Sequence, residues 1–382
     1  MIEEIREQFR NYFHTEPIMF SSPGRVNLIG EHTDYNNGFV LPASINKYIH
    51  FAVAPNINGE YRFYSYDLKE EYRTPLHELD PGNVQWANYL LGVIKQFVKD
   101  GRQVPGFDCM FGGNVPLGAG MSSSASIECG LAYAINHIFE FDYLPLDLIK
   151  FSQKAEHEYA GVQCGIMDQF AVMQGKKDHV IMLDCRSLEF RYFPLKMREY
   201  VLVLVNTGVK HSLASSEYNK RRQECDMGVS ILKKYDDSIN SLRDVSLNFI
   251  EAHKDEIPDV VYKRCTYVIE ENIRLQNACE QLLNGDVYAF GQFMYGSHEG
   301  LRDKYEVSCP ELDQLVEIAK SVEGVLGARM MGGGFGGCTI NLIKKRQVEL
   351  FKEFIKQKYT TPDGKEPQIY EVVIEDGTKQ IA

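Results

Sequence analysis

Apolar residues recur with two different periods along this chain, and these periods predict where helices and strands lie. The apolar residues of segment 2–13 repeat at helical spacing, which predicts an N-terminal helix. Apolar segments at 39–41, 48–54 and 61–65 are separated by Pro, Asn and Gly, as strands and turns are. The first part of the chain is therefore expected to begin as a β-rich region.

The second half of the chain is predicted to be mainly helical and then mixed. Residues 201–206 form an unbroken apolar run that is typical of a buried strand, and helical patterns dominate from about residue 218 to residue 321. A strand–strand–helix–strand series is predicted after that, at residues 325–330, 339–342, 347–359 and 369–374. Such a series suits helices on one face of a mostly antiparallel sheet.

Length and composition favour a globular protein with two lobes. The chain has 382 residues, which is long for one ordinary core. Its apolar fraction of 44% and charged fraction of 25% are those of a protein that can bury two cores. The expected division places one lobe at residues 1–200 and the other at residues 201–382.

Charge and cysteine content exclude several kinds of partner. A formal net charge of -12 would repel phosphate backbones, so we expect no nucleic-acid partner. No apolar run is long enough to span a membrane, and the N-terminus reads as a charged amphipathic helix, so we expect a cytoplasmic protein without a membrane partner. Nine cysteines without C-x-x-C spacing indicate reduced thiols rather than disulfides or a zinc site.

The stretch 23–35 carries the densest group of chemically active side chains. Two carboxylates, an imidazole and a hydroxyl follow a buried strand within four residues, at Glu31, His32, Thr33 and Asp34. An ordinary turn would use Gly, Asn and Ser there. The group could therefore hold a polyhydroxylated ligand, a metal ion, or only water.

A glycine and serine loop at residues 112–126 leads into a predicted helix at 127–139. Serine hydroxyls could cap that helix, and its free backbone N–H groups and dipole could hold a phosphate. The alternative is an ordinary capped helix after a flexible turn, which is the simpler interpretation of such a loop alone. Neither the G-x-x-x-x-G-K-[ST] pattern nor a G-x-G-x-x-G dinucleotide pattern is present.

Two further stretches carry candidate chemistry. Asp168 lies between apolar neighbours, where an aspartate usually caps a helix or pairs with an arginine, but it could also accept a proton from a substrate hydroxyl. Residues 331–338 contain five glycines in six positions, which are costly to order. That loop indicates either a close backbone approach to a ligand or a tight hairpin with bulges.

Taken together, these motifs resemble those of the galactokinases. Residues 24–35 (Gly-Arg-Val-Asn-Leu-Ile-Gly-Glu-His-Thr-Asp-Tyr) resemble the galactokinase signature, and residues 116–125 resemble the phosphate loop of the wider GHMP small-molecule kinases. Residues 330–339 resemble the third motif of that superfamily. Residues 164–169 and 216–219 also match galactokinase positions in order and spacing, so the resemblance covers nearly the whole chain.

The resemblance implies a fold and an activity. The fold would be α+β, the two-lobed GHMP kinase fold, with a ribosomal-protein-S5-like N-terminal lobe, a ferredoxin-like C-terminal lobe, mostly antiparallel sheets and the active site in the cleft between the lobes. The activity would be ATP- and Mg²⁺-dependent phosphorylation of α-D-galactose at its C1 hydroxyl, by a monomer. The alternatives are a kinase for N-acetylgalactosamine or another galactose-like sugar, and a sensor that binds galactose and ATP without catalysis.

The same resemblance implies roles for individual residues. Asp168 would be the general base and Arg25 the partner that keeps it ionised. Sugar binding would involve Glu31, His32, Thr33, Asp34, Gly165 and Tyr218. The ATP phosphates would lie against Gly118, Ala119, Gly120, Met121, Ser122, Ser123 and Ser124. The Mg²⁺ ligands would be Ser124 and Glu156. Adenine would contact Trp86 and Tyr89, although a lone tryptophan on an amphipathic helix suits the core equally well.

Overall fold

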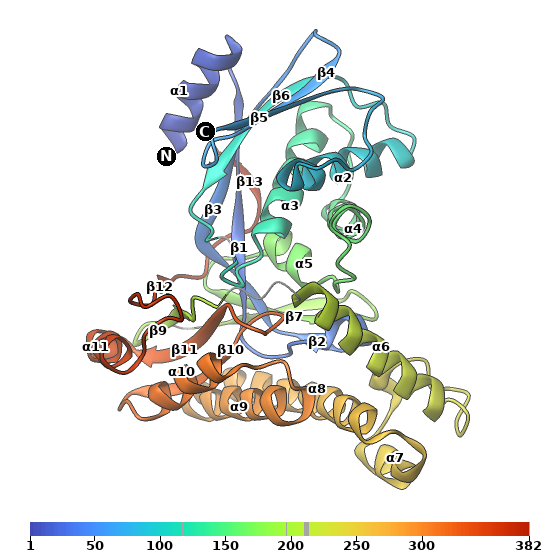
Figure 1. Ribbon diagram of the computed structural model, residues 1–382, viewed down its shortest axis with the longest axis vertical. Coiled ribbons are helices and arrows are strands. Elements are labelled where there is room, and N and C mark those ends of the chain that lie inside the picture. The colour runs from blue at the N-terminus through green and yellow to red at the C-terminus, as the bar shows by residue number, and fades with distance from the viewer. Residues whose placement is uncertain (117, 196, 210–213, 382) are drawn as a thin grey trace.

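The computed structural model describes residues 1–116, 118–195, 197–209 and 214–381. Within these ranges the strands form sheets of six, four and three strands. Figure 1 shows the six-stranded sheet at one end of an elongated molecule and the four-stranded sheet, with its long helices, at the other. Among the helices described, none has both the length and the apolar character needed to cross a membrane.

The six-stranded sheet has the order β13-β1-β3-β6-β4-β5. Its strands are β1 (Ile18–Asn27), β3 (Pro42–Pro55), β4 (Glu60–Ser65), β5 (Glu70–Pro75), β6 (Phe107–Gly113) and β13 (Lys379–Ile381). Neighbouring strands are antiparallel except β4 and β6, which are parallel. The β-rich start predicted from the apolar pattern is therefore confirmed.

Helices cover this sheet on both faces. The N-terminal helix α1 (Ile2–Phe13) packs against β3 and β6 through Ile5, Phe9 and Phe13, which confirms the helix predicted there. The other helices of this part are α2 (Gln85–Lys99), α3 (Ser123–Ile138), α4 (Pro145–Ala155) and α5 (Met167–Gln174), and Figure 1 shows them together on the other face. A single π-helical turn extends α4 over Glu156–Ala160 and ends at Gly161.

The second part of the chain is built on the four-stranded sheet β10-β11-β9-β12. Its strands are β9 (Tyr200–Asn206), β10 (Val325–Met330), β11 (Cys338–Lys344) and β12 (Ile369–Val372), all antiparallel to their neighbours. Its helices are α6 (Ala214–Leu232), α7 (Leu247–Ala252), α8 (Asp259–Asn284), α9 (Val287–Gly300), α10 (Pro310–Lys320) and α11 (Val348–Lys358). The predicted strand–strand–helix–strand series at the C-terminal end is confirmed.

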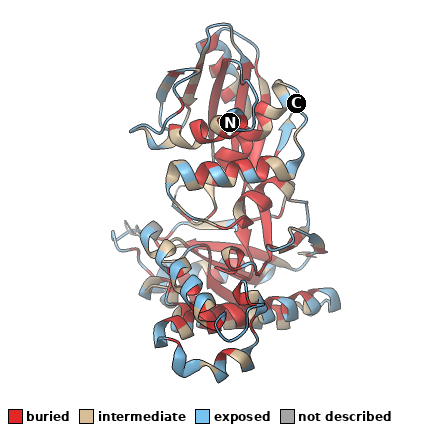
Figure 2. Ribbon diagram, turned by 90° about the vertical axis from the view of Figure 1, so that its right-hand side faces the viewer, coloured by how far each residue is buried: buried red, intermediate tan, exposed pale blue. Residues whose placement is uncertain are grey.

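The two parts are joined by a shared core and a returning strand. A three-stranded sheet of β2 (Phe39–Val40), β7 (His179–Asp184) and β8 (Phe190–Pro194) lies where they meet, and α8 contacts both β2 and β8. Strand β13 pairs with β1, so the last residues of the chain return to the first sheet. Figure 2 shows buried residues running through both sheets. The division at residues 200 and 201 stays a prediction.

Candidate active site

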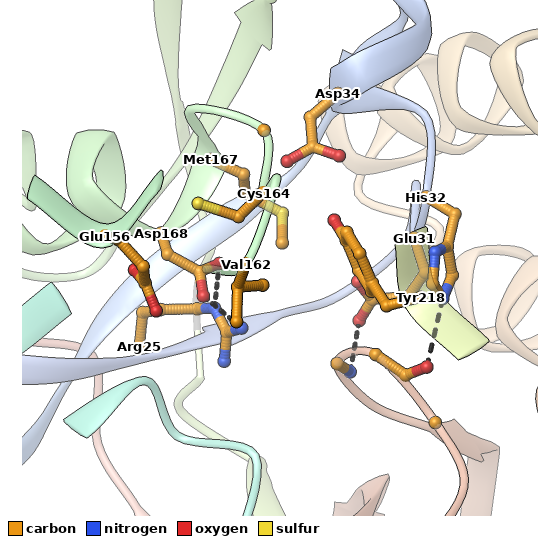
Figure 3. Close-up of a pocket in the computed structure, with 14 residues that line it drawn as sticks. Arg25, Glu31, His32, Asp34, Glu156, Val162, Cys164, Met167, Asp168 and Tyr218 are labelled. Atoms are coloured by element: carbon orange, nitrogen blue, oxygen red, sulfur yellow. Dashed lines mark hydrogen bonds and ion pairs between the residues drawn. The ribbon is translucent and has the colours of Figure 1, made fainter. Parts of the chain in front are cut away.

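A cavity of about 250 Å³ brings together side chains that lie far apart in the sequence. The first motif contributes Arg25, Glu31, His32 and Asp34 to its lining. The segment between α4 and α5 contributes Glu156, Val162, Cys164 and Gly165, and α5 itself contributes Met167 and Asp168. The remaining lining residues are Tyr218 from α6 and residues 332–334 from the glycine loop. Figure 3 shows these side chains converging from different elements. Eight of the residues predicted from the sequence thus share one cavity.

The turn after β1 is held by Thr33, which does not line the cavity. Its hydroxyl contacts the carbonyl oxygens of Gly30, at 2.9 Å, and Phe39, at 2.5 Å, and the residue is fully buried. Thr33 therefore shapes the turn that presents its neighbours Glu31 and Asp34.

Asp168 and Arg25 form a bidentate ion pair at the base of the cavity. Arg25 Nε donates to Asp168 Oδ1 and Nη2 donates to Oδ2, both at 2.8 Å. Arg25 is 4% exposed, and its remaining nitrogen Nη1 donates to the carbonyl oxygen of Gly120 in the predicted phosphate loop. The pair therefore links the Asp168 carboxylate to that loop through Arg25.

The serines at the start of α3 bond to carboxylates instead of capping the helix. Ser122 Oγ donates to Asp168 Oδ2, and Ser124 Oγ donates to Glu156 Oε1 at 2.8 Å. Among the described residues no side chain caps α3, so the prediction that serine hydroxyls cap it is wrong. The physical reason is that Ser122, at the N-cap position, has a left-handed φ of 56° in place of the extended backbone of a capping residue, and its hydroxyl is directed to a carboxylate. Leu117 lies outside the described residues.

Glu156 is buried beside other acidic groups. Gln169 Nε2 donates to Glu156 Oε2 at 2.8 Å, and the same nitrogen lies 3.4 Å from Glu128 Oε2. Burial, together with the charge of Asp168, raises the pKa of Glu156 to about 7 although its hydrogen bond from Ser124 opposes the shift. A cation bound between Ser124 and Glu156 would favour the ionised form of this carboxyl, and both residues offer the oxygen ligands that Mg²⁺ prefers.

Arg329 is a functional residue that the sequence reasoning missed. It lies on β10, is fully buried, and Nη2 donates to Glu31 Oε1 at 2.6 Å. The backbone N–H of Gly332 donates to the same oxygen at 2.8 Å. Glu31 is thereby tied to the glycine loop. An arginine inside the apolar run 325–330 was the available signal, because an unpaired charge is rarely buried.

Asp34 faces the opposite side of the cavity from Arg25, as Figure 3 shows. Burial and the nearby charge of Asp168 raise the pKa of Asp34 to about 7. Gly165 lies against this carboxylate so closely that a Cβ there would overlap it. Tyr218 stands between Asp34 and His32, and its ring centroid is 5.1 Å from that of His32.

The predicted adenine residues Trp86 and Tyr89 do not line this cavity. Trp86 Nε1 donates to Glu70 Oε2 at 2.8 Å, and its ring packs against Phe111 at a centroid distance of 5.6 Å. Burial, with smaller contributions from Glu156 and Glu128, raises the pKa of Tyr89 to about 12. The adenine role of both residues stays a prediction.

The predicted phosphate loop lies against the glycine loop. Residues 118–124 run from Gly118 into α3, and a Cβ on Gly120 would lie 3.3 Å from the carbonyl oxygen of Met331. The backbone N–H of Arg25 donates to the carbonyl oxygen of Met121 at 3.1 Å. The two glycine-rich motifs and the first motif therefore meet in one place, although the glycine loop lies more than 200 residues along the chain from the other two.

Comparison with known families matches three parts of the chain. The galactokinase galactose-binding signature matches residues 7–55, the GHMP kinases N terminal domain matches residues 88–176, and the GHMP kinases C terminal domain matches residues 278–361.

Individual proteins resemble the chain over almost its whole length. A galactokinase of Thermotoga neapolitana is 43% identical over 360 residues, which cover 94% of this chain and 99% of that protein. A galactokinase of Clostridium acetobutylicum is 43% identical over 388 residues, covering 100% and 99%. The crystal structure of Lactococcus lactis galactokinase complexed with galactose superposes with a TM-score of 0.95 at 34% identity, over 99% of both chains. A Methanococcus jannaschii mevalonate kinase, with a TM-score of 0.65 at 18% identity and coverage of 94% and 99%, shares the fold.

Proposed function

Because this chain belongs to the galactokinase family and phosphorylates galactose with ATP, we propose that transfer occurs at the C1 hydroxyl beside Asp168. The observation that carries this assignment is the bidentate pair of Asp168 and Arg25 inside the cavity. This pair supports the proposal because it brings a carboxylate and a fixed cation together in a cavity that could receive a hydroxyl and a phosphoryl group.

The polar wall of the cavity suits a sugar. Carboxylates such as Asp34 and Glu31 can each accept two neighbouring O–H groups, and the phenol of Tyr218 can donate or accept. Gly165 leaves the space that Asp34 occupies, because a side chain there would displace the carboxylate. We propose that Glu31, Asp34, Gly165 and Tyr218 bind the galactose hydroxyls. A sugar that lacks one of these hydroxyls would leave a buried polar group unpaired.

Catalysis in this site depends on positioning and charge. Asp168 orients the C1 hydroxyl and accepts its proton as that oxygen attacks the terminal phosphoryl group. Arg25 keeps Asp168 ionised beforehand and stabilises the negative charge that develops on the transferred group. The hydrogen bond from Ser122 fixes the Asp168 carboxylate on its third side. Burial of Arg25 reduces the screening of this charge by water.

We propose that the loop of residues 118–124 holds the ATP phosphates and that Ser124 and Glu156 hold Mg²⁺. The support is the hydrogen-bonded pair of oxygen ligands at the start of α3, together with the excess of buried carboxyl groups around it. When bound, Mg²⁺ would neutralise phosphate charge. A monomer in the cytoplasm remains part of this proposal, and light scattering of the purified protein tests the monomer.

The decisive experiment compares wild-type protein with Asp168→Ala in a coupled ADP-release assay. The variant should lose turnover by about a thousandfold or more while ATP binding stays near normal. Asp108→Ala is a matched control, because Asp108 forms the same bidentate pair with Arg62 away from the cavity. Retained activity of Asp168→Ala would contradict the assignment.

The sugar is tested by ADP release with galactose against N-acetylgalactosamine, galactosamine, glucose and arabinose. We expect the highest kcat/KM with galactose, because residues 7–55 match the galactokinase galactose-binding signature. A preference for N-acetylgalactosamine would contradict the proposed sugar assignment without affecting the role of Asp168.

A further inference from the structure

His32 has protein partners at both nitrogens of its ring. Nε2 lies 3.2 Å from the carbonyl oxygen of Gly333 in the glycine loop, and Nδ1 lies 2.7 Å from the hydroxyl of Tyr35. Figure 3 shows the first of these contacts as a dashed line. A carbonyl oxygen can only accept, so Nε2 must carry the proton and donate it.

The protonation of His32 decides the direction of the second bond. Burial, with the charges of Arg221 and Arg329 nearby, lowers the pKa of His32 to about 3, so the ring is neutral. A neutral ring that donates from Nε2 must accept at Nδ1, and the hydroxyl of Tyr35 is therefore its donor.

The same reasoning gives the direction of the next two hydrogen bonds, which lead from Tyr35 to Tyr305 and Cys225. The hydroxyl oxygens of Tyr35 and Tyr305 are 2.7 Å apart, and because the Tyr35 proton points to His32, Tyr305 donates to Tyr35. Cys225 Sγ lies 3.3 Å from the Tyr305 hydroxyl and donates the next proton in turn. These groups form a series of hydrogen bonds in which each donates to the next, from Cys225 on α6 through Tyr305 and Tyr35 to His32.

The segment that carries Tyr305 also holds the far side of the glycine loop. Arg221 Nε donates to the carbonyl oxygen of Tyr305 at 2.8 Å, which ties this segment to α6. Two residues later, the carbonyl oxygen of Val307 accepts the backbone N–H of Phe335 at 2.7 Å. Gly334, with a φ of +83°, lies so close to that carbonyl oxygen that a Cβ would overlap it.

The glycine loop is consequently fixed from three directions. Its residue 332 donates to Glu31, residue 333 accepts from His32, and residue 335 donates to Val307. Its other side faces Gly120, whose carbonyl oxygen accepts from Arg25. One loop therefore supports both the sugar wall and the phosphate loop.

We propose that His32, fixed as the Nε2–H tautomer by Tyr35 and Tyr305, positions the glycine loop for both substrates and gives the sugar no hydrogen bond of its own. This inference rests on the proposed function, and it assigns His32 a different role from the sugar contact expected by resemblance. Tyr35 and Tyr305 are positioning residues that act through His32.

The first test compares His32→Gln with His32→Asn. The amide nitrogen of glutamine can reach the place of Nε2, whereas that of asparagine stays near the place of Nδ1. We expect His32→Gln to retain kcat/KM for galactose within about fivefold and His32→Asn to lose about fiftyfold. The backbone alone favours the opposite order, because His32 has a φ of 61° and asparagine adopts this conformation readily. An asparagine variant as active as the glutamine variant would overturn the proposal.

The second test asks whether His32 bonds to the sugar. Wild-type protein and His32→Asn are compared on galactose and on 2-deoxy-, 4-deoxy- and 6-deoxygalactose. We expect the same fold-loss in kcat/KM for every sugar, because no hydroxyl interacts with the ring nitrogens. A deoxy sugar on which the variant matches wild-type protein would identify a direct hydrogen bond and overturn the proposal.

The third test removes single hydroxyls from the chain. Tyr305→Phe should raise KM for galactose and for ATP together, by about five- to tenfold each. Tyr61→Phe is a matched control, since Tyr61 lies on β4 and its buried hydroxyl donates to the carbonyl oxygen of Val104 in the loop before β6. The melting temperature should fall by a similar amount in both variants, but only Tyr305→Phe should change the KM values. Unchanged KM values in Tyr305→Phe would overturn the positioning role of the hydrogen bonds between Tyr305, Tyr35 and His32. Wild-type protein that is inactive on galactose would instead refute the proposed function.

Discussion

Two aspartates face the same cavity in opposite electrostatic surroundings. Asp168 is held by two hydrogen bonds from Arg25 and one from Ser122, and its side chain is 26% exposed. Asp34 is 9% exposed and faces Asp168 and Glu31, and the pKa of Asp34 is raised to about 7 by burial first and by these charges next. The same residue type is therefore paired with a cation in one place and buried beside other acidic groups in the other.

In the proposed function, this difference separates reaction chemistry from recognition. A carboxylate that must accept a proton needs a fixed charge state before the substrate arrives, and a neighbouring guanidinium provides it. A carboxyl that recognises hydroxyls needs no fixed charge state beforehand, because the sugar donates hydrogen bonds to it on binding. Variants that remove the neighbouring charges test this difference between Asp168 and Asp34.

Removal of the cation should have the largest effect. In Arg25→Met, Asp168 loses its partner and resembles Asp34, so we expect kcat to fall by about a thousandfold, measured by ADP release. The matched control is Arg62→Met, which breaks the bidentate pair with Asp108 and should leave kcat near normal while lowering stability. An unchanged kcat in Arg25→Met would remove the distinction between the two aspartates.

Glu31 extends the comparison to a third acid, which is paired like Asp168 but fully buried. Arg329→Met would leave the Glu31 carboxylate without its cation, so we expect a loss of about 3 kcal/mol in the free energy of unfolding, measured by urea denaturation. The double variant Glu31→Gln with Arg329→Met should recover part of this loss. Equal stability of the single and double variants would show that the unpaired charge is not the cause.

Asp34→Asn keeps the shape of the side chain but removes its charge. We expect KM for galactose to rise by about tenfold or more with a smaller change in kcat, because an amide accepts fewer O–H groups than a carboxylate. Steady-state kinetics at saturating ATP measures both constants. A loss confined to kcat would instead place Asp34 in the chemistry, beside Asp168.

The pH dependence should show the smallest effect. Because the pKa of Asp34 is about 7, we expect kcat/KM for galactose to fall by about fivefold between pH 7 and pH 6, and Asp34→Asn to flatten this limb of the pH profile. For stability the sign is opposite. The folded pKa of Asp34 lies above its ordinary value, so its contribution is present below about pH 4 and is lost as pH rises through 7. If the fall of kcat/KM below pH 7 persists in Asp34→Asn, a group other than Asp34 causes it.

Local pattern was sufficient for most elements, and the resemblance of the motifs to those of the galactokinases supplied most of the predicted site. The N-terminal helix, the β-rich start, the closing strand–strand–helix–strand series and the two-lobed GHMP kinase fold are confirmed. Arg25, Glu31, Asp34 and Asp168 were all named from their motifs and meet in one cavity. The serine hydroxyls at the start of α3 were misassigned as caps, because their true partners Asp168 and Glu156 lie more than 30 residues away.

The sequence by itself determined which residue types could bind and transfer a phosphoryl group, because motif chemistry depends on neighbours along the chain. Only the tertiary structure decided which other groups hold them: the hydrogen bond from Ser122 to Asp168, the buried Arg329 behind Glu31, and the hydrogen bonds from Cys225 to His32. Charge state and hydrogen-bond direction depend on burial and on groups hundreds of residues away. These are properties of the folded interior that no local pattern contains.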